Sequence, residues 1–171
     1  MRHFVSFRKA TIDDLPLLKY WDTKQHVIDC DPDSDWNWEE ELKKDPPWRQ
    51  QFVAEVQKRP LGFVQIIDAH EEETHYWGDV EPHTMAIDIW IGEEEDLNKG
   101  YGSTMMRNAL DLCFMNPLVN KVLIDPLKTN TKAHRFYERL GFKFLEERKF
   151  GDSDSFVYIM TRDSWIWFGT P

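Results

Sequence analysis

The 171-residue chain has little cysteine, no long apolar run and fewer positive than negative charges. Its two cysteines, Cys30 and Cys113, form neither a CxxC pair nor a disulfide framework. No eighteen consecutive apolar residues occur, so the sequence predicts no membrane span. The N-terminal residues lack the apolar centre of a signal peptide, and we therefore expect a cytoplasmic protein.

The shortage of positive charge restricts the kind of partner. Lys and Arg number 21 against 31 Asp and Glu, which gives a formal net charge of −10 at pH 7. A nucleic-acid partner would need a basic surface, so we expect none. The charge suits a small cationic molecule, although acidic surfaces also keep proteins in solution.

Tryptophan, in contrast, is abundant, with eight residues. Trp36, Trp38, Trp48 and Trp77 lie in or beside acidic segments rather than in periodic apolar patterns. Aromatic walls combined with carboxylates are what a pocket for a bulky, ammonium-bearing molecule needs. The stretch 29–41 has this character, but a solvated loop followed by a charged helix is an equally good interpretation.

The segment from Met85 to Gly102 predicts a strand, a glycine-bearing loop and the start of a helix. Apolar residues alternate from Met85 to Ile91, and Asn98 to Ser103 leads into a helical pattern. The first N–H groups of a helix have no internal partner and favour an anion, which the glycines would let approach closely. A tight turn without a ligand is the alternative.

A second pattern follows in the next forty residues. Residues 122–126 read as a short buried strand that a proline stops. Asn130 can cap a helix that ends at Gly141 and has Ala133 and Tyr137 on its apolar face. The other elements that we expect are strands over 4–8, 51–57, 61–67, 142–147 and 156–161, with a turn at Lys58-Arg59-Pro60, and helices after Asp13 or Asp14 and after Gly102.

The loop Leu97-Asn98-Lys99-Gly100-Tyr101-Gly102 and the block from Asp125 to Phe142 together resemble the GCN5-related N-acetyltransferase (GNAT) superfamily. That family holds the pyrophosphate of acetyl-CoA on a loop of the form Gln/Arg-x-x-Gly-x-Gly/Ala, and Leu97 departs from its first position. The departure and the Ile87-Asp88 pair look most like the aminoglycoside 6'-N-acetyltransferases. The resemblance implies a single α/β domain over 1–171, with a mixed, mostly antiparallel sheet splayed at its centre and helices on both faces.

The resemblance also implies acetyl-CoA as the co-substrate. The loop would supply backbone N–H groups to the pyrophosphate, and the end of the strand at residues 89–91 would hydrogen-bond the pantetheine arm. Asn130 would contact the cofactor arm or merely cap its helix. The residues implied in acetyl-CoA binding are Ile89, Trp90, Ile91, Leu97, Asn98, Lys99, Gly100, Tyr101, Gly102, Ser103, Thr104, Asn130, Ala133 and Tyr137.

Asp88 is the leading candidate for a catalytic base. A carboxylate inside an otherwise apolar strand is costly unless it has a partner or a task, and desolvation should raise its pKa. By resemblance it would orient and deprotonate the amine of the acceptor, although Ile89 follows it where the family has glutamine. An aspartate satisfied by a neighbouring loop is the alternative. Tyr137 matches a tyrosine that serves as general acid in the family, or is ordinary core packing.

The acceptor site is expected to contain Trp36, Glu73, Tyr76, Asp88, Asp125 and Asp152. Glu73 and Tyr76 follow from counting back from Asp88 to positions that the 6'-acetyltransferases use. Asp125 lies at the carboxyl end of a strand, where α/β sheets bind ligands, but Pro126 makes a purely structural turn equally credible. Three histidines between Asp68 and Thr84 fit no common zinc spacing, so no metal is expected.

These features predict an N-acetyltransferase that modifies a primary amine on a small polycationic acceptor, most like the 6'-amine of an aminoglycoside. Neither cysteine has a nearby base, so direct transfer in a ternary complex is simpler than a covalent intermediate. A siderophore-pathway acyltransferase acting on hydroxylysine-type amines is one alternative. A GNAT module that binds an acyl-CoA or a polyamine without turnover is another. The oligomeric state stays open.

Overall fold

The computed structural model describes residues 4–169, with side chains through Ile166. The chain divides into two compact units. Unit 1 consists of Met1–Gln65 and Asp88–Met106, and unit 2 of Ile66–Ile87 and Arg107–Pro171. Two strands and one helix contribute residues to both units.

Strands and helices are mixed along the described residues, as in an α/β fold. The strands are β1 (Ser6–Lys9), β2 (Arg49–Val56), β3 (Arg59–Asp68), β4 (Thr84–Ile91), β5 (Lys121–Ile124), β6 (Lys143–Phe150) and β7 (Ser153–Thr161). The helices are α1 (Leu15–Trp21), α2 (Gln25–Ile28), α3 (Trp38–Glu41), α4 (Tyr101–Met115), α5 (Thr131–Arg139) and α6 (Arg162–Gly169), with 3₁₀ turns η1 (Ile12–Asp14) and η2 (Glu94–Asp96).

The strands form one seven-stranded sheet in the order β1-β2-β3-β4-β5-β7-β6. β4 and β5 are parallel over Thr84–Ala86 only, whereas β1–β2, β5–β7 and β6–β7 are antiparallel. The predicted fold class, a mixed and mostly antiparallel sheet that is splayed at its centre, is confirmed. The predicted single domain over 1–171 stays a prediction.

Unit 1 is organised by a hairpin and an aromatic core. β1 pairs with β2, and Gln57 and Lys58 form the turn to β3 with left-handed backbone (φ 51° and 66°). Arg59 and Pro60 therefore belong to β3, and the expected turn at 58–60 is wrong by one residue. The core contains Ala10, Leu18, Trp21, Trp38, Val53 and Phe63.

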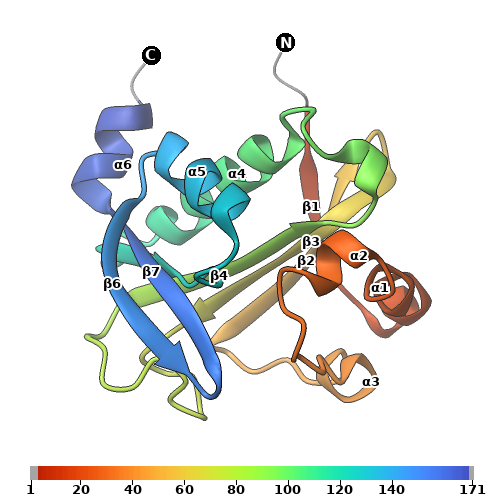
Figure 1. The fold of residues 1–171 in the computed structure, drawn as a ribbon, viewed down its shortest axis with the longest axis horizontal. Helices are drawn as coiled ribbons and strands as arrows, with labels where there is room; N and C mark the ends of the chain where they lie inside the picture. Colours follow the sequence, from red (N-terminus) through yellow and green to blue (C-terminus); the bar gives the residue numbers. More distant parts are fainter. Residues whose placement is uncertain (1–3, 170–171) are drawn as a thin grey trace. The chain divides into compact units, whose positions relative to one another are not determined.

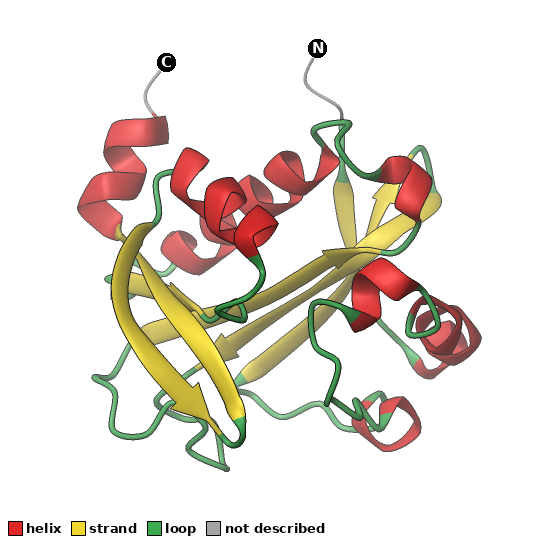
Figure 2. Cartoon of the chain, viewed as in Figure 1, coloured by secondary structure: helices red, strands yellow, loops and turns green. Residues whose placement is uncertain are grey.

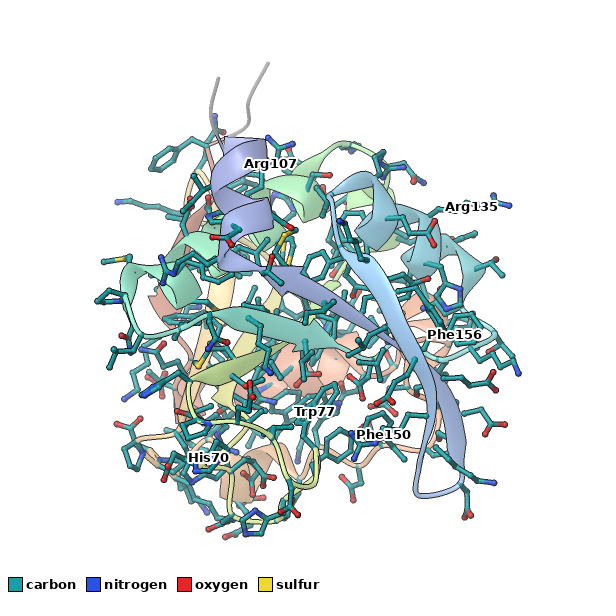
Figure 3. All side chains as sticks on the ribbon, turned by 90° about the vertical axis from the view of Figure 1, so that its left-hand side faces the viewer. His70, Trp77, Arg107, Arg135, Phe150 and Phe156 are labelled. Carbon is teal, nitrogen blue, oxygen red and sulfur yellow. The ribbon has the colours of Figure 1, made fainter. Side chains whose placement is uncertain are left out.

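Unit 2 contains the long β6–β7 hairpin, which the predicted pair 142–147 and 156–161 anticipated (Figure 1). The segment 69–83 leads into β4 without forming a helix or strand (Figure 2). Its Trp77 packs edge-on against Phe150 of the hairpin, with ring centroids 5.2 Å apart (Figure 3). Trp77 joins Ala69, Ala86, Leu123 and Val157 in the core of this unit.

The long helix α4 has the buried face that its periodicity predicts. Met106, Ala109 and Leu110 on α4 are fully buried, and so is nearly all of Cys113. Burial raises the pKa of the Cys113 thiol to about 12, which makes it an inert core residue at neutral pH. No helix among the described residues is long and apolar enough to cross a membrane.

Candidate active site

The candidate site of unit 1 lies where β3 and β4 place alternate side chains on one face. Phe63 and Gln65 are two residues apart on β3, and Asp88 and Trp90 are two residues apart on β4. The rings of Phe63 and Trp90 lie 4.7 Å apart, and Gln65 Nε2 donates to Asp88 Oδ2 over 2.8 Å. The two strands therefore present an aromatic pair beside a polar pair.

Asp88 has the properties of a base held out of water. Its side chain is half-buried, and burial raises its pKa to about 6, against the opposing effect of the Gln65 hydrogen bond. The charge of Asp31 raises the pKa further. Its second oxygen, Oδ1, accepts no hydrogen bond from the residues that the structure describes. That oxygen is available to an incoming amine.

Aromatic side chains form a wall beside this carboxylate. Trp36 stacks on Trp38 with parallel rings 5.0 Å apart, and it tilts against Trp90 at 5.1 Å. Trp38 Nε1 donates to Asp22 over 2.6 Å. Burial raises the pKa of Asp22, against the Trp38 hydrogen bond, and nearby Asp35 raises it further. The structure thus brings the predicted Trp36 against Trp90, on the strand of Asp88, and places the carboxylate of Asp22 on the neighbouring Trp38.

The Trp90 side chain belongs to this aromatic wall. The resemblance, in contrast, implied that Trp90 contacts the cofactor. Its indole nitrogen is buried and has no hydrogen-bond partner among the described residues. The backbone of the next residue is engaged, because His26 Nε2 lies 2.9 Å from Ile91 O. Ile89 to Ile91 stay predicted cofactor contacts.

The segment from α1 to α2 is fastened to the end of β4. Trp21 Nε1 donates to Glu93 Oε1 over 3.2 Å, and Lys24 forms an ion pair with the same carboxylate at 3.0 Å. Gly92 lies directly on the Trp21 ring, since a Cβ at this position would fall 2.0 Å from Trp21 Cε2. The backbone at the end of β4 is therefore fixed from one side by α1 and α2.

The predicted anion loop has the geometry that a phosphate needs. Asp96 is buried and receives two hydrogen bonds from Arg59, of 2.7 and 3.0 Å, which anchor the loop. Asn98 and Gly100 adopt left-handed backbone (φ 60° and 83°), and a Cβ on Gly100 would meet nothing within 4 Å. The chain then enters α4, where the first helical bond runs from Thr104 N to Gly100 O.

The N–H groups of Gly102 and Ser103 precede that first bond and point out of the helix end. The exposed Gly100 and the fifteen-residue helix behind it form a cradle of the kind that attracts an anion, and its role toward the pyrophosphate stays a prediction. Leu97, Lys99, Tyr101 and Thr104 complete the segment. The cradle and Asp88 both belong to unit 1.

The remaining predicted acceptor residues lie in unit 2. Tyr76 O–H donates to Asp125 Oδ2 over 2.6 Å, and the Tyr76 ring stacks on Phe150 at 4.6 Å. The structure thus brings Tyr76 and Asp125 together, as a site would require. Asp152 is exposed in the turn of the β6–β7 hairpin and has no polar contact among the described residues.

Glu73 is exposed, and it too has no polar contact within the described part of the chain. Its neighbour Glu72 is buried instead, and accepts hydrogen bonds from Thr74 N, Thr74 Oγ1 and Tyr76 N. The carboxylate that organises this turn is therefore Glu72. The role of Glu73 toward an acceptor stays a prediction.

α5 positions the other predicted cofactor residues. Asn130 caps the helix, since its Oδ1 accepts from Ala133 N over 3.1 Å, and its contact with the cofactor arm stays a prediction. Tyr137 is half-buried and packs against Phe142 at 5.7 Å and Tyr158 at 6.4 Å. Its packing role is therefore present, and its role as general acid stays a prediction.

Two residues of the site escaped the sequence analysis. Gln65 is 5 % exposed, and its Oε1 accepts from Gln51 Nε2 over 2.8 Å. The available signal was an amide within the apolar run Leu61–Ile67, the same signal that singled out Asp88. Asp31 lies in the acidic stretch that the sequence identified, but no pattern distinguished it from its neighbours.

A cavity of about 270 Å³ in unit 2 contains none of the predicted site residues. Its floor includes Leu123, Val157 and Ile159, and its rim includes Lys121 and Arg148. No group of three or more His, Cys, Asp or Glu side chains in the described residues could hold a metal ion.

Comparison with known proteins places this geometry in a family. The model of the acetyltransferase (GNAT) domain matches residues 11–150. The chain is 25 % identical over 174 residues to an aminoglycoside N(6')-acetyltransferase type 1 of Klebsiella pneumoniae, covering 94 % of this chain and 84 % of that protein. It is 23 % identical over 155 residues to the lysine N-acyltransferase MbtK of Mycolicibacterium paratuberculosis, covering 83 % and 66 %.

A similar fold occurs in a solved structure of AAC(6')-Ib in complex with parmomycin and acetyl-CoA. The TM-score is 0.87 at 23 % identity, covering 97 % of this chain and 98 % of that one. The likeness to this structure concerns the fold, whereas the match of the family model makes the assignment specific. The chain belongs to the acetyltransferase (GNAT) family. The predicted enzyme class, N-acetyltransferase, and the predicted co-substrate, acetyl-CoA, are confirmed.

Proposed function

We propose that this protein acetylates a primary amine of a small polycationic acceptor, with the 6'-amine of an aminoglycoside as the best candidate. The observation that carries the proposal is Asp88, a half-buried carboxylate with one free oxygen beside a tryptophan wall. The similarity to an aminoglycoside N(6')-acetyltransferase over 94 % of the chain supports the acceptor class.

Asp88 would receive the acceptor and its proton. An ammonium group binds the free Oδ1, and an amine becomes nucleophilic when that oxygen takes its proton. A carboxyl pKa of about 6 leaves most of Asp88 ionised at pH 7. This pKa is closer to the pKa of an amine than the pKa of an ordinary aspartate is. Proton transfer from the amine to Asp88 therefore costs less free energy.

The surroundings of Asp88 suit a polycation with an extended body. Trp36 and Trp90 offer ring faces, and Asp31 adds a second negative charge. Ring faces and carboxylates attract ammonium groups through different interactions, so together they favour molecules with several amines. Tyr76 and Asp125 are proposed to contact other parts of the acceptor, as are Glu73 and Asp152.

The loop and α4 would hold the donor. Backbone N–H groups of the loop from Leu97 to Thr104 that precede the first helical bond, such as those of Gly102 and Ser103, would bind the pyrophosphate, and the open space around Gly100 would allow close approach. When bound, acetyl-CoA supplies an activated thioester, whose acetyl group forms a C–N bond with the amine as the C–S bond breaks. Tyr137 is proposed to protonate the departing thiolate.

The test measures release of the CoA thiol from acetyl-CoA with one acceptor at a time: kanamycin, tobramycin, hydroxylysine, spermine and a short peptide. The expected result is fast release with the aminoglycosides and its loss in Asp88→Asn, while binding of CoA by calorimetry is unchanged. Release with an aminoglycoside that persists at the wild-type rate in Asp88→Asn would remove Asp88 from the mechanism.

Hydroxylysine-type amines form the second candidate, because the chain also resembles a lysine N-acyltransferase. Release with hydroxylysine alone would transfer the function to that chemistry. CoA binding without release from any acceptor in the panel would point to an amine outside the panel or to a module that binds acyl-CoA without turnover.

A further inference from the structure

Three polar side chains form a continuous line across β2, β3 and β4. Gln51 Nε2 donates to Gln65 Oε1 over 2.8 Å, and Gln65 Nε2 donates to Asp88 Oδ2 over 2.8 Å. Gln51 is half-buried and Gln65 is 5 % exposed. Withdrawing two amides from water costs free energy unless they are hydrogen-bonded. Few other pairings of these three side chains are therefore possible.

The chemistry of the carboxylate fixes the direction of the whole line. An ionised Asp88 can only accept hydrogen bonds, so the NH₂ group of Gln65 must face it. The Gln65 oxygen then faces Gln51, whose NH₂ group must face that oxygen in turn. Reversing either amide would place two acceptors or two donors opposite each other. The orientation of both glutamines therefore follows from one negative charge.

We infer that Gln65 is a positioning residue for the Asp88 carboxylate and that Gln51 holds Gln65 in place. The inference rests on the proposed role of Asp88 as base. By occupying Oδ2, Gln65 leaves Oδ1 as the oxygen that meets the acceptor, and it limits rotation of the carboxylate about χ2. Neither glutamine touches the reacting atoms.

The arrangement also sets the balance between the two forms of Asp88. A hydrogen bond donated to a carboxylate stabilises its ionised form, whereas burial and the negative charge of Asp31 stabilise the protonated form. Asp31, from the loop after α2, is the charged group that acts on Asp88. Gln65 is a neutral donor, so it counters these effects without introducing a positive charge that would repel a cationic acceptor.

The test is a titration of the Asp88 carboxyl carbon by ¹³C NMR in protein labelled at aspartate Cγ. The signal is identified by its absence in Asp88→Asn. In Gln65→Met, a substitution of similar length without a donor, we expect the midpoint to rise by about one pKa unit. In Gln51→Met the midpoint should rise by less, because Gln65 remains but is no longer fixed.

Gln50→Met is the matched control, since Gln50 is exposed on the neighbouring position of β2. Its midpoint should equal that of the wild type. The ascending limb of kcat/KM against pH, measured with the best acceptor, should move upward with the NMR midpoint in Gln65→Met. KM for acetyl-CoA should not change in any of the three variants.

An Asp88 midpoint that is the same in Gln65→Met, Gln51→Met and wild type would overturn the inference. The NMR titration needs no turnover, so it stands apart from the proposed function. If the midpoint shifts in Gln65→Met but activity survives in Asp88→Asn, then Gln65 does position the carboxylate, and Asp88 is not the base.

Discussion

Asp88 in unit 1 and Glu72 in unit 2 are both carboxylates withdrawn from water in segments rich in aromatic and acidic residues. Burial acts to raise the pKa of each. Glu72 nevertheless has its pKa held below the usual range, because Tyr76 N, Thr74 N and Thr74 Oγ1 donate to it. Asp88 has one donor, the Gln65 amide, and its pKa stays raised.

The comparison shows that burial alone does not decide whether the pKa of a carboxyl group is raised. A carboxylate saturated by donors is locked in its ionised form and serves the local backbone, whereas one with a vacant oxygen can exchange a proton. Glu72 organises the turn of Tyr76, and Asp88 retains a site for a ligand. Four predictions separate these two roles.

The largest expected effect is on turnover. Asp88→Asn should lower kcat/KM by about 10²–10⁴-fold, the usual contribution of a positioned general base. Glu72→Gln should not reduce kcat by more than about threefold, since Glu72 has no proton to exchange at neutral pH. Steady-state kinetics at pH 7.5 with one acceptor tests both. Equal losses of kcat in the two variants would contradict the distinction.

Stability should respond in the opposite order. Glu72→Gln should lower the free energy of unfolding by about 2 kcal/mol at pH 7, because hydrogen bonds to a buried charge are lost. The contribution of Glu72 is present above its usual pKa and lost as pH falls through its lowered folded-state pKa. Urea unfolding at several pH values measures the difference.

Glu73→Gln is the control, because Glu73 is exposed and lacks polar contacts among the described residues. Its effect should stay within about 0.5 kcal/mol. A loss in Glu73→Gln as large as that in Glu72→Gln would mean that the turn depends on general negative charge.

The pH dependence of wild-type kcat/KM reports the free Asp88. Activity should rise about tenfold per pH unit up to a midpoint near 6 and then level, as the carboxyl loses its proton. A midpoint near the ordinary pKa of aspartate would show that burial does not raise the pKa of Asp88 in the free enzyme. Initial rates between pH 4.5 and 8 at low acceptor concentration are sufficient.

The smallest effect is a gain in stability. The raised pKa means that folded protein binds a proton more tightly than unfolded protein between pH 3.8 and about 6, so stability falls as pH rises through this window. Asp88→Asn has no carboxyl group to lose a proton, so it should not lose stability in this window. At pH 8 its free energy of unfolding should exceed that of the wild type by about 1–2 kcal/mol, a value reduced to allow for the partial exposure of Asp88. The gain should vanish near pH 4.

Periodicity and capping rules anticipated much of the fold. The alternation before Asp88 predicted β4, the glycine loop predicted the start of α4, and Asn130 was recognised as the cap of α5. The hairpin turn was misplaced because Gln57 and Lys58 adopt a left-handed conformation that usually favours glycine or asparagine.

The site was less accessible to sequence reasoning. A carboxylate in an apolar strand identified Asp88, but its donor lies 23 residues away and depends on the register between β3 and β4. The choice between Glu72 and Glu73 had no periodic basis, because the turn from Asp68 to Tyr76 has neither helical nor strand spacing. Local hydrogen bonds decided which of the two is buried.

The acidic stretch between α2 and α3 is bounded by two fixed points. His26 meets the carbonyl of Ile91 on one side, and Trp38 is tied to Asp22 on the other. Because both ends of this stretch are held, substitutions between these points need not displace β4, which carries Asp88. If the stretch contacts the acceptor, as proposed, a laboratory library confined to residues 29–35 should change acceptor preference while Asp88 keeps its place.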